Sequence, residues 1–331
     1  MIENSFQSGI HLILILQSLG SWLTPIMQLI SGMGSELFVL LIAPIFYWSI
    51  DAALGLRLGL FLMVSAGVNN ALKLVFHAPR PYWYTTQVKA YTSEASFGIP
   101  SGHAQNAVVF WGALAYYLHR TWVWILGITI IVLVGLSRIY LGVHFPVDVV
   151  AGWLIGLLLL WVLITLEPLI LKWLRMHNQA EKLVASLLLS VLIILLNLVA
   201  RFNLRAWVIP SQWIENAKFA FHDIPIDPLA LSEAISTSGA FFGLAAGSIL
   251  MNEKGGYYAG GELWKRVVRY VFGLVGMVVL YFGLRQILPQ GEAFLPQLLR
   301  YLRYSLLGFW LTYLAPLIFI RLNLADPENR A

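Results

Sequence analysis

Apolar stretches close to twenty residues long recur along this chain, and they constrain its fold more than any other feature. One such stretch can cross a hydrocarbon layer about 30 Å thick as a single helix. Only 11% of the 331 residues are charged, whereas a soluble domain carries about 25%. The sequence therefore predicts an all-α fold, a polytopic transmembrane helical bundle.

Ten spans are predicted, six in a core and about four in a C-terminal unit. The basic segment 172–182 interrupts the apolar pattern, so we expect a membrane-embedded core over residues 1–178 and a second transmembrane unit over residues 179–331. The predicted spans are approximately 11–31, 35–51, 54–76, 101–118, 121–138, 146–171, 183–201, 233–251, 267–288 and 298–321.

Charge and cysteine content exclude several classes of function. The formal net charge is +5, but the basic residues lie mostly at helix ends and form no solvated stripe, which argues against nucleic acid as a partner. The chain has no cysteine, which excludes disulfides, thiolate catalysis and cysteine metal sites.

The first polar cluster pairs Lys73 with Arg80 at the end of a predicted span. Ionisable side chains in membrane helices usually face a polar cavity, and Pro79 and Pro81 restrict the chain around Arg80. A binding role for the two cations is one interpretation. The alternative is that both snorkel to lipid headgroups.

The second cluster is Pro100-Ser101-Gly102-His103, which opens the predicted span 101–118. Ser101 can cap the helix and Gly102 lets a ligand approach the backbone. Free N–H groups at a helix N-terminus bind anions, and His103 would project nearby. The alternative is an ordinary cap followed by an interfacial histidine.

The third cluster places Arg138, His144 and Asp148 between two predicted spans. Pro146 suits the first turn of a helix, and Asp148 can then reach one ring nitrogen of His144 and leave the other free as a nucleophile. The alternative is an ion pair between Asp148 and Arg138. A metal site at His103, His144 and Asp148 is disfavoured because three cations would oppose a divalent ion.

The three clusters together resemble the type 2 phosphatidic acid phosphatase superfamily, which also contains glucose-6-phosphatase and the vanadium haloperoxidases. The resemblance covers roughly residues 35–170 and fills every motif position. Those positions are Lys73-x6-Arg80-Pro81, Pro100-Ser101-Gly102-His103 and Ser137-Arg138-x5-His144-x3-Asp148.

The resemblance implies a metal-independent phosphatase that needs no cofactor. His144 would attack phosphorus and become a phosphohistidine, Asp148 would orient it, and His103 would protonate the leaving oxygen. The phosphate would be held by the remaining five positions, which are Lys73, Arg80, Ser101, Gly102 and Arg138.

The substrate class stays open at this level. Within the family, a site at the membrane surface implies a lipid phosphate or diphosphate, such as phosphatidic acid, phosphatidylglycerol phosphate, polyprenyl diphosphate or a sphingoid base phosphate. A sugar phosphate, a phosphotransferase reaction and, from a different class, an anion or lipid transporter are the alternatives. Small residues in the span 233–251 suit close helix packing, either on the core or in a homodimer.

Counting the ten spans places all three clusters on one side of the membrane and both chain termini on the other. Apart from the cluster residues, Lys and Arg are more frequent on the side of the termini, which predicts that side to be cytoplasmic. The site is therefore expected to face the non-cytoplasmic side. The segment after Pro210 is expected at the outer interface, either as a short helix beginning near Ser211 or as an ordinary loop with aromatic anchors.

Overall fold

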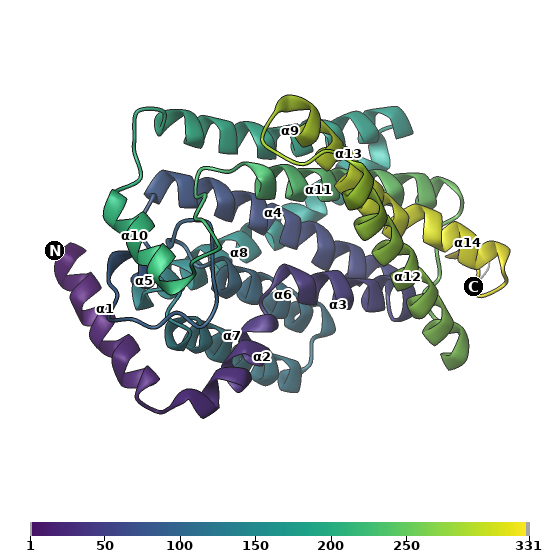
Figure 1. Cartoon of the computed structure of the whole chain (residues 1–331). Helices are drawn as coiled ribbons and strands as arrows, with labels where there is room; N and C mark the ends of the chain where they lie inside the picture. Colours follow the sequence, from purple (N-terminus) through teal and green to yellow (C-terminus); the bar gives the residue numbers. More distant parts are fainter. Residues whose placement is uncertain (1, 329–331) are drawn as a thin grey trace. The chain divides into compact units, whose positions relative to one another are not determined.

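The structure is a computed structural model that describes residues 2–328, with side chains for all of these except 2–5, 36, 37, 39 and 40. Helices make up all of its regular structure in this range, which confirms the predicted all-α fold (Figure 1). In chain order they are α1 (Ile2–Gln17), η1 (Ser21–Leu23), α2 (Thr24–Gly32), α3 (Glu36–Ser49), α4 (Ala52–Phe76), α5 (Pro81–Tyr84), α6 (Gly102–Leu118), α7 (Thr121–Tyr140), α8 (Pro146–Met176), α9 (Gln179–Asn203), α10 (Ser211–Ala220), α11 (Ser232–Glu253), α12 (Leu263–Ile287), α13 (Phe294–Phe309), η2 (Trp310–Leu314) and α14 (Ala315–Arg321).

Seven helices within the described residues are long and apolar enough to cross a membrane, and the N-terminal pair would make an eighth if counted as one span. This confirms a multi-pass membrane protein. The predicted spans 35–51 and 101–118 correspond to α3 and α6, which have only 14 and 17 residues. The expected helix near Ser211 is α10.

The helices form two compact units, and each unit collects segments that are distant in the sequence. Unit 1 contains Met1–Phe38, Val68–Trp161 and Asn197–Ala230, and unit 2 contains Val39–Gly67, Val162–Leu196 and Leu231–Ala331. The functional division expected near residue 178 stays a prediction.

The first predicted span, 11–31, is wrong as a single helix. Gly20 has a positive φ of 102°, a conformation that glycine adopts without the steric penalty of a Cβ atom. The helical segments on its two sides, Phe6–Gln17 and Ser21–Gly32, meet at 87°. Figure 1 shows this sharp turn between α1, in purple, and α2.

Helix α1 lies across one end of unit 1. Near its start, the ring of Phe6 stacks on that of Phe145, with centroids 4.5 Å apart. At its other end, Gln17 Nε2 donates to the carbonyl oxygen of Tyr140 at 2.9 Å. Tyr140 ends α7 and Phe145 immediately precedes α8, so both ends of α1 contact the same end of the helix bundle. The start of the chain therefore lies at the end that carries His144, whereas the span count predicted the opposite end.

Helix α2 then enters unit 1 beside α7. The Thr24 hydroxyl lies 3.1 Å from that of Tyr140, and Ser31, the penultimate residue of α2, accepts a hydrogen bond from Arg138. Several apolar side chains of α1 and of the turn after it are exposed, which suits a helix lying in the membrane interface. They are Leu12, Leu14, Ile15, Leu19 and Trp22.

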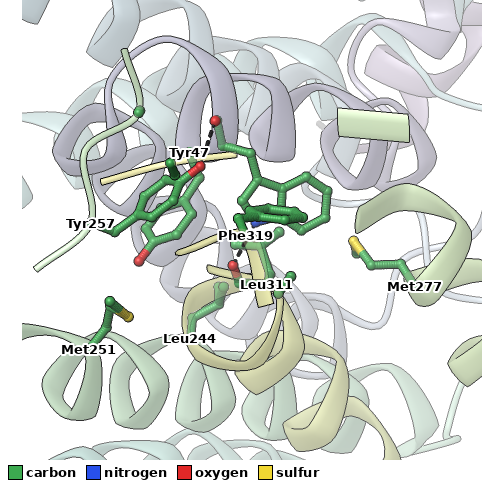
Figure 2. Packing of buried hydrophobic residues seen from close by; sticks show 11 residues of the cluster. Tyr47, Leu244, Met251, Tyr257, Met277, Leu311 and Phe319 are labelled. Carbon is green, nitrogen blue, oxygen red and sulfur yellow. Dashed lines mark hydrogen bonds between the residues drawn. The ribbon is translucent and has the colours of Figure 1, made fainter. Parts of the chain in front are cut away.

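Unit 2 has an aromatic core around Trp48 (Figure 2). The Trp48 indole donates to the carbonyl oxygen of Leu311 at 2.8 Å, and the Tyr257 hydroxyl donates to the carbonyl oxygen of Trp48, also at 2.8 Å. Tyr47 and Tyr257 stack with centroids 5.9 Å apart. Large aromatic surfaces with satisfied polar ends give this core both apolar burial and directional contacts.

The small residues of α11 serve packing inside unit 2. A Cβ atom added at Gly239 or Gly243 would collide with the carbonyl oxygens of Tyr301 and Ser305 on α13. Small residues let helix backbones approach closely where lipid provides no hydrophobic driving force. The predicted close packing of the span 233–251 therefore takes place against α13.

Candidate active site

All eight predicted site residues lie in unit 1. The centre of the site is His144, in the short connection between α7 and α8. Its Nδ1 lies 3.2 Å from Asp148 Oδ2, which also accepts from the backbone N–H of Phe145 at 2.9 Å. Both side chains are buried. The carboxylate holds the proton on Nδ1 and leaves the lone pair on Nε2, as the spacing of the two residues predicted.

Arg80 is fully buried and its guanidinium reaches that free nitrogen, with Nη1 3.1 Å from His144 Nε2. The same guanidinium donates to the backbone carbonyl oxygens of Ser96 (2.6 Å), Val143 (3.0 Å) and Phe97 (3.1 Å). Five N–H groups in a rigid plane allow arginine to make all of these contacts together. Arg80 therefore binds three carbonyl oxygens on two backbone segments and the imidazole at once, and it does not snorkel to lipid.

Lys73 and Arg138 occupy the last turns of α4 and α7, and both are buried. Lys73 Nζ donates to the Ser96 hydroxyl at 2.8 Å, and the same hydroxyl lies 3.3 Å from Arg80 Nη2. Arg138 Nη1 donates to the hydroxyl of Ser31 at 2.8 Å. The fold thus brings together Lys73 from α4, Arg80 from the connection before α5 and Arg138 from α7.

The start of α6 is fixed against α8. The Ser101 hydroxyl accepts from the N–H of Ala104 at 3.5 Å, which confirms the predicted cap, and the Ser101 N–H donates to the carbonyl oxygen of Asp148 at 2.9 Å. A Cβ atom at Gly152 would lie 2.6 Å from the Ser101 carbonyl oxygen, so glycine is needed for this close approach. A Cβ at Gly102 would lie 3.0 Å from the side-chain oxygen of Asn69.

Sequence reasoning missed Glu94, whose carboxylate pairs closely with Arg138 and lies 3.6 Å from Arg80 Nη2. Burial by itself would raise the pKa of Glu94, but Arg80, Arg138, His103 and Lys73 hold it well below its ordinary value. The carboxylate is therefore ionised and lies among the predicted phosphate-binding groups. His103 is the second residue of α6 and follows the Ser101 cap.

Two further residues that contact the cations, Ser31 and Ser96, could not be identified from the sequence. Ser31 and Ser96 are ordinary serines in a helix and a loop, and no local pattern marks them. Glu94 had one usable signal, because it is the only acidic residue between Tyr82 and Ile99. Tyr82 is 2% exposed, and its hydroxyl bonds to the backbone of Glu94.

The charge of the site favours an anion as its ligand. Three cations surround His144, and within residues 2–328 the structure forms no group of three or more His, Asp or Glu side chains suited to a metal ion. Arginine and lysine donors around a free imidazole nitrogen can bind a phosphate, neutralise charge on its oxygens and expose phosphorus to attack.

Two regions of the chain match known families. Residues 54–172 match the PAP2 superfamily, and residues 235–327 match the PAP2 superfamily phosphatase, transmembrane extension. The first region contains all eight predicted site residues, from Lys73 to Asp148.

The chain is also similar to individual proteins. The chain is 34% identical to Phosphatidylglycerophosphatase B of Bacillus subtilis (strain 168), with 43% of this chain and 73% of that protein covered. It is 26% identical to Sphingosine-1-phosphate phosphatase 1 of Rattus norvegicus, with 87% of this chain and 69% of that protein covered. The crystal structure of a transmembrane PAP2-type phosphatidylglycerolphosphate phosphatase from Bacillus subtilis is 28% identical, covers 50% of this chain and 86% of its own, and has a TM-score of 0.43.

Proposed function

Because this chain belongs to the PAP2 superfamily and is an integral membrane phosphatase of that type, we propose that it hydrolyses the phosphate or diphosphate of a membrane lipid through a phosphohistidine at His144. One observation carries the proposal. His144 is held by Asp148 on one nitrogen while the other nitrogen lies 3.1 Å from Arg80, one of three buried cations of the site.

The proposed reaction has two steps at one phosphorus atom. In the first, His144 Nε2 forms a bond to phosphorus, the bond from phosphorus to the lipid oxygen breaks, and His103 gives that oxygen a proton. In the second, His103 takes a proton from water as the water oxygen attacks phosphorus. The N–P bond then breaks, which releases phosphate and regenerates His144.

The surrounding residues have supporting roles in this scheme. Asp148 stabilises the imidazole as it becomes positively charged, since its carboxylate already accepts the Nδ1 proton. Lys73, Arg80 and Arg138 neutralise the phosphoryl oxygens, and Ser101 and Gly102 add donors at the start of α6. All of these residues lie within residues 1–178, and we propose that residues 179–331 are a C-terminal transmembrane region that adds no catalytic residue.

The test is phosphate release by the purified full chain in detergent, with an excess of metal chelator. The substrates are phosphatidic acid, phosphatidylglycerol phosphate, a polyprenyl diphosphate, a sphingoid base phosphate and glucose 6-phosphate. We expect chelator-resistant release from at least one lipid and less from the sugar phosphate. Faster release from glucose 6-phosphate would replace the lipid assignment with a sugar phosphatase. No release from any member would contradict the proposal and favour transfer or transport.

We also propose that the site faces the non-cytoplasmic side. α6 begins at the site and ends before Arg120, so Arg120 lies at the opposite end of unit 1. α10 contacts the site end through Asn216, whose side chain donates to the carbonyl oxygen of Trp83 at 2.9 Å. If each long helix crosses the membrane once, the segments outside the site that fall on the side of Arg120 carry more Lys and Arg than those on the other side, which predicts that they face the cytoplasm.

The absence of cysteine in the chain allows a direct test of this orientation. Single cysteines at the exposed positions Arg120 and Lys218, the second on α10, are treated in intact cells with a membrane-impermeant maleimide. We expect Lys218→Cys to be labelled and Arg120→Cys to be labelled only after the membrane is permeabilised. The reverse pattern would place the site on the cytoplasmic side.

The protonation of His144 gives a prediction that does not depend on substrate. Burial, together with Arg80, Arg138 and Lys73, holds the pKa of His144 well below its ordinary value. In the unfolded chain a histidine has a pKa of about 6.5. Below about pH 6.5 the unfolded state therefore binds more protons than the folded state. The free energy of unfolding decreases as the pH falls through this value.

We expect the imidazole of His144 to remain neutral from about pH 8 to about pH 6, where a free histidine becomes protonated. NMR of histidine-labelled protein measures this, with the His144 resonance assigned by its loss in His144→Gln. A resonance that titrates near the free value would contradict the neutral nucleophile.

A further inference from the structure

We propose that Glu94 is a built-in anion that occupies the phosphate-binding cations in the empty enzyme and is displaced when a phosphate binds. This inference rests on the proposed function and concerns the same site. It assigns a role to the one carboxylate in the site that the phosphohistidine reaction does not use.

Glu94 lies against two of the three cations of the site. One carboxylate oxygen pairs with Arg138 Nη2 and the other lies 3.6 Å from Arg80 Nη2. The second guanidinium nitrogen of Arg80, Nη1, is 3.1 Å from His144 Nε2. Glu94 therefore uses donors that lie directly beside the nucleophile, and a phosphate placed for attack by His144 would need the same donors.

The side chain of Glu94 is free to rotate away from the cations. Its side chain is 23% exposed, in contrast to the side chains of Arg80 and Arg138, which are 0% and 3% exposed. Its backbone is fixed, because the Tyr82 hydroxyl accepts from the Glu94 N–H at 3.0 Å and donates to the Glu94 carbonyl oxygen at 2.9 Å. Rotation of the side chain alone can therefore move the carboxylate from the cations toward solvent.

The net charge of the site also favours exchange of Glu94 for a phosphate. Lys73, Arg80 and Arg138 contribute three positive charges and Asp148 contributes one negative charge. A phosphate dianion neutralises the two positive charges that remain. A Glu94 carboxylate kept in the same place would add an uncompensated negative charge at a buried site, which is unfavourable. Exchange of one anion for the other leaves one positive charge in the empty site and none when the phosphate dianion is bound, so the cations have a nearby anion in both states.

This exchange makes Glu94 a competitor of every phosphate ligand, including the released product. Weaker product binding favours turnover when release limits the rate. Removal of the carboxylate charge should therefore tighten phosphate binding, and it should leave Arg80 and Arg138 without this ion-pair partner when phosphate is absent.

The experiment compares wild type with Glu94→Gln by calorimetric titration with inorganic phosphate, using the full chain in detergent. We expect phosphate to bind Glu94→Gln about tenfold more tightly, equivalent to about 1.4 kcal/mol. We also expect a lower melting temperature than wild type without phosphate and a larger increase when phosphate is added. Glu215→Gln removes an exposed carboxylate from α10 in the same unit and is expected to leave phosphate affinity unchanged.

Equal or weaker binding of phosphate by Glu94→Gln would overturn the proposal, since it would mean that the carboxylate supports the site and does not compete for it. If Glu94→Gln does not fold, Glu94→Asp replaces it. Its shorter side chain cannot reach both guanidinium groups, and a smaller gain in affinity is expected. If the wild-type protein neither binds phosphate nor releases it from any substrate, the proposed function itself is refuted. Normal wild-type binding and hydrolysis without a gain in the variant would refute only the role of Glu94.

Discussion

Replacement of His144 by alanine is expected to lower kcat for phosphate release by at least about 10⁴-fold, because it removes the nucleophile of a two-step reaction. The buried cations and the helix start can still bind phosphate, so binding of inorganic phosphate should persist. Substrate turnover and calorimetric titration of the same preparation separate these two effects. Wild-type turnover in His144→Ala would show that another group attacks phosphorus.

A matched variant tests the covalent intermediate. His103→Ala keeps the nucleophile but removes the proposed acid and base, so hydrolysis of the phosphoenzyme should slow. With a radiolabelled substrate whose leaving group needs no proton, we expect acid-labile, alkali-stable label to accumulate on His103→Ala. No label should appear on His144→Ala. If His103→Ala still hydrolyses the substrate but carries no label, water attacks phosphorus directly.

Replacement of Arg80 by lysine is expected to lower kcat/KM by about 10²–10³-fold although the charge is kept. The Arg80 guanidinium donates to the carbonyl oxygens of Ser96, Val143 and Phe97 while Nη1 meets His144 Nε2. A lysine ammonium has three donors at one point and cannot satisfy this planar set. Buried acceptors left without partners cost about 1–3 kcal/mol each, so the melting temperature should also fall.

The control for this substitution is Arg120→Lys. Arg120 is exposed at the other end of α6 and α7, so neither activity nor melting temperature should change appreciably. Steady-state kinetics and thermal unfolding in the same detergent measure both effects. An Arg80→Lys enzyme with wild-type kcat/KM would show that charge, and not the fixed geometry of the guanidinium, is what the site requires.

Local spacing explains why much of the site could be predicted. Asp148 follows His144 by four residues at the start of a helix, a separation at which side chains meet regardless of the rest of the fold. Ser101 caps α6 because a serine before a helix accepts from the backbone one turn later. Both contacts involve neighbours in the sequence, and the structure contains both.

The site contacts that could not be predicted join residues far apart in the sequence. Ser31 bonds with Arg138 across 107 residues, and Glu94 reaches it across 44. Such pairs depend on how helices pack, which no local pattern of these residues indicates. The bend at Gly20 is a similar case, because the apolar run 11–31 has the length of a span and only the packing of Phe6 and Gln17 places α1 across the end of the bundle.

The sequence by itself determined the helical membrane fold, the family and the identity of the eight proposed site residues, because hydropathy over twenty residues and motif spacing are properties of the linear chain. Tertiary structure alone decided that Lys73, Arg80 and Arg138 converge beside the free nitrogen of His144, with Glu94 between two of them. That convergence follows from the packing of α4, α6, α7 and α8 with the loop before α6, where buried charges must find partners whatever their distance in the sequence.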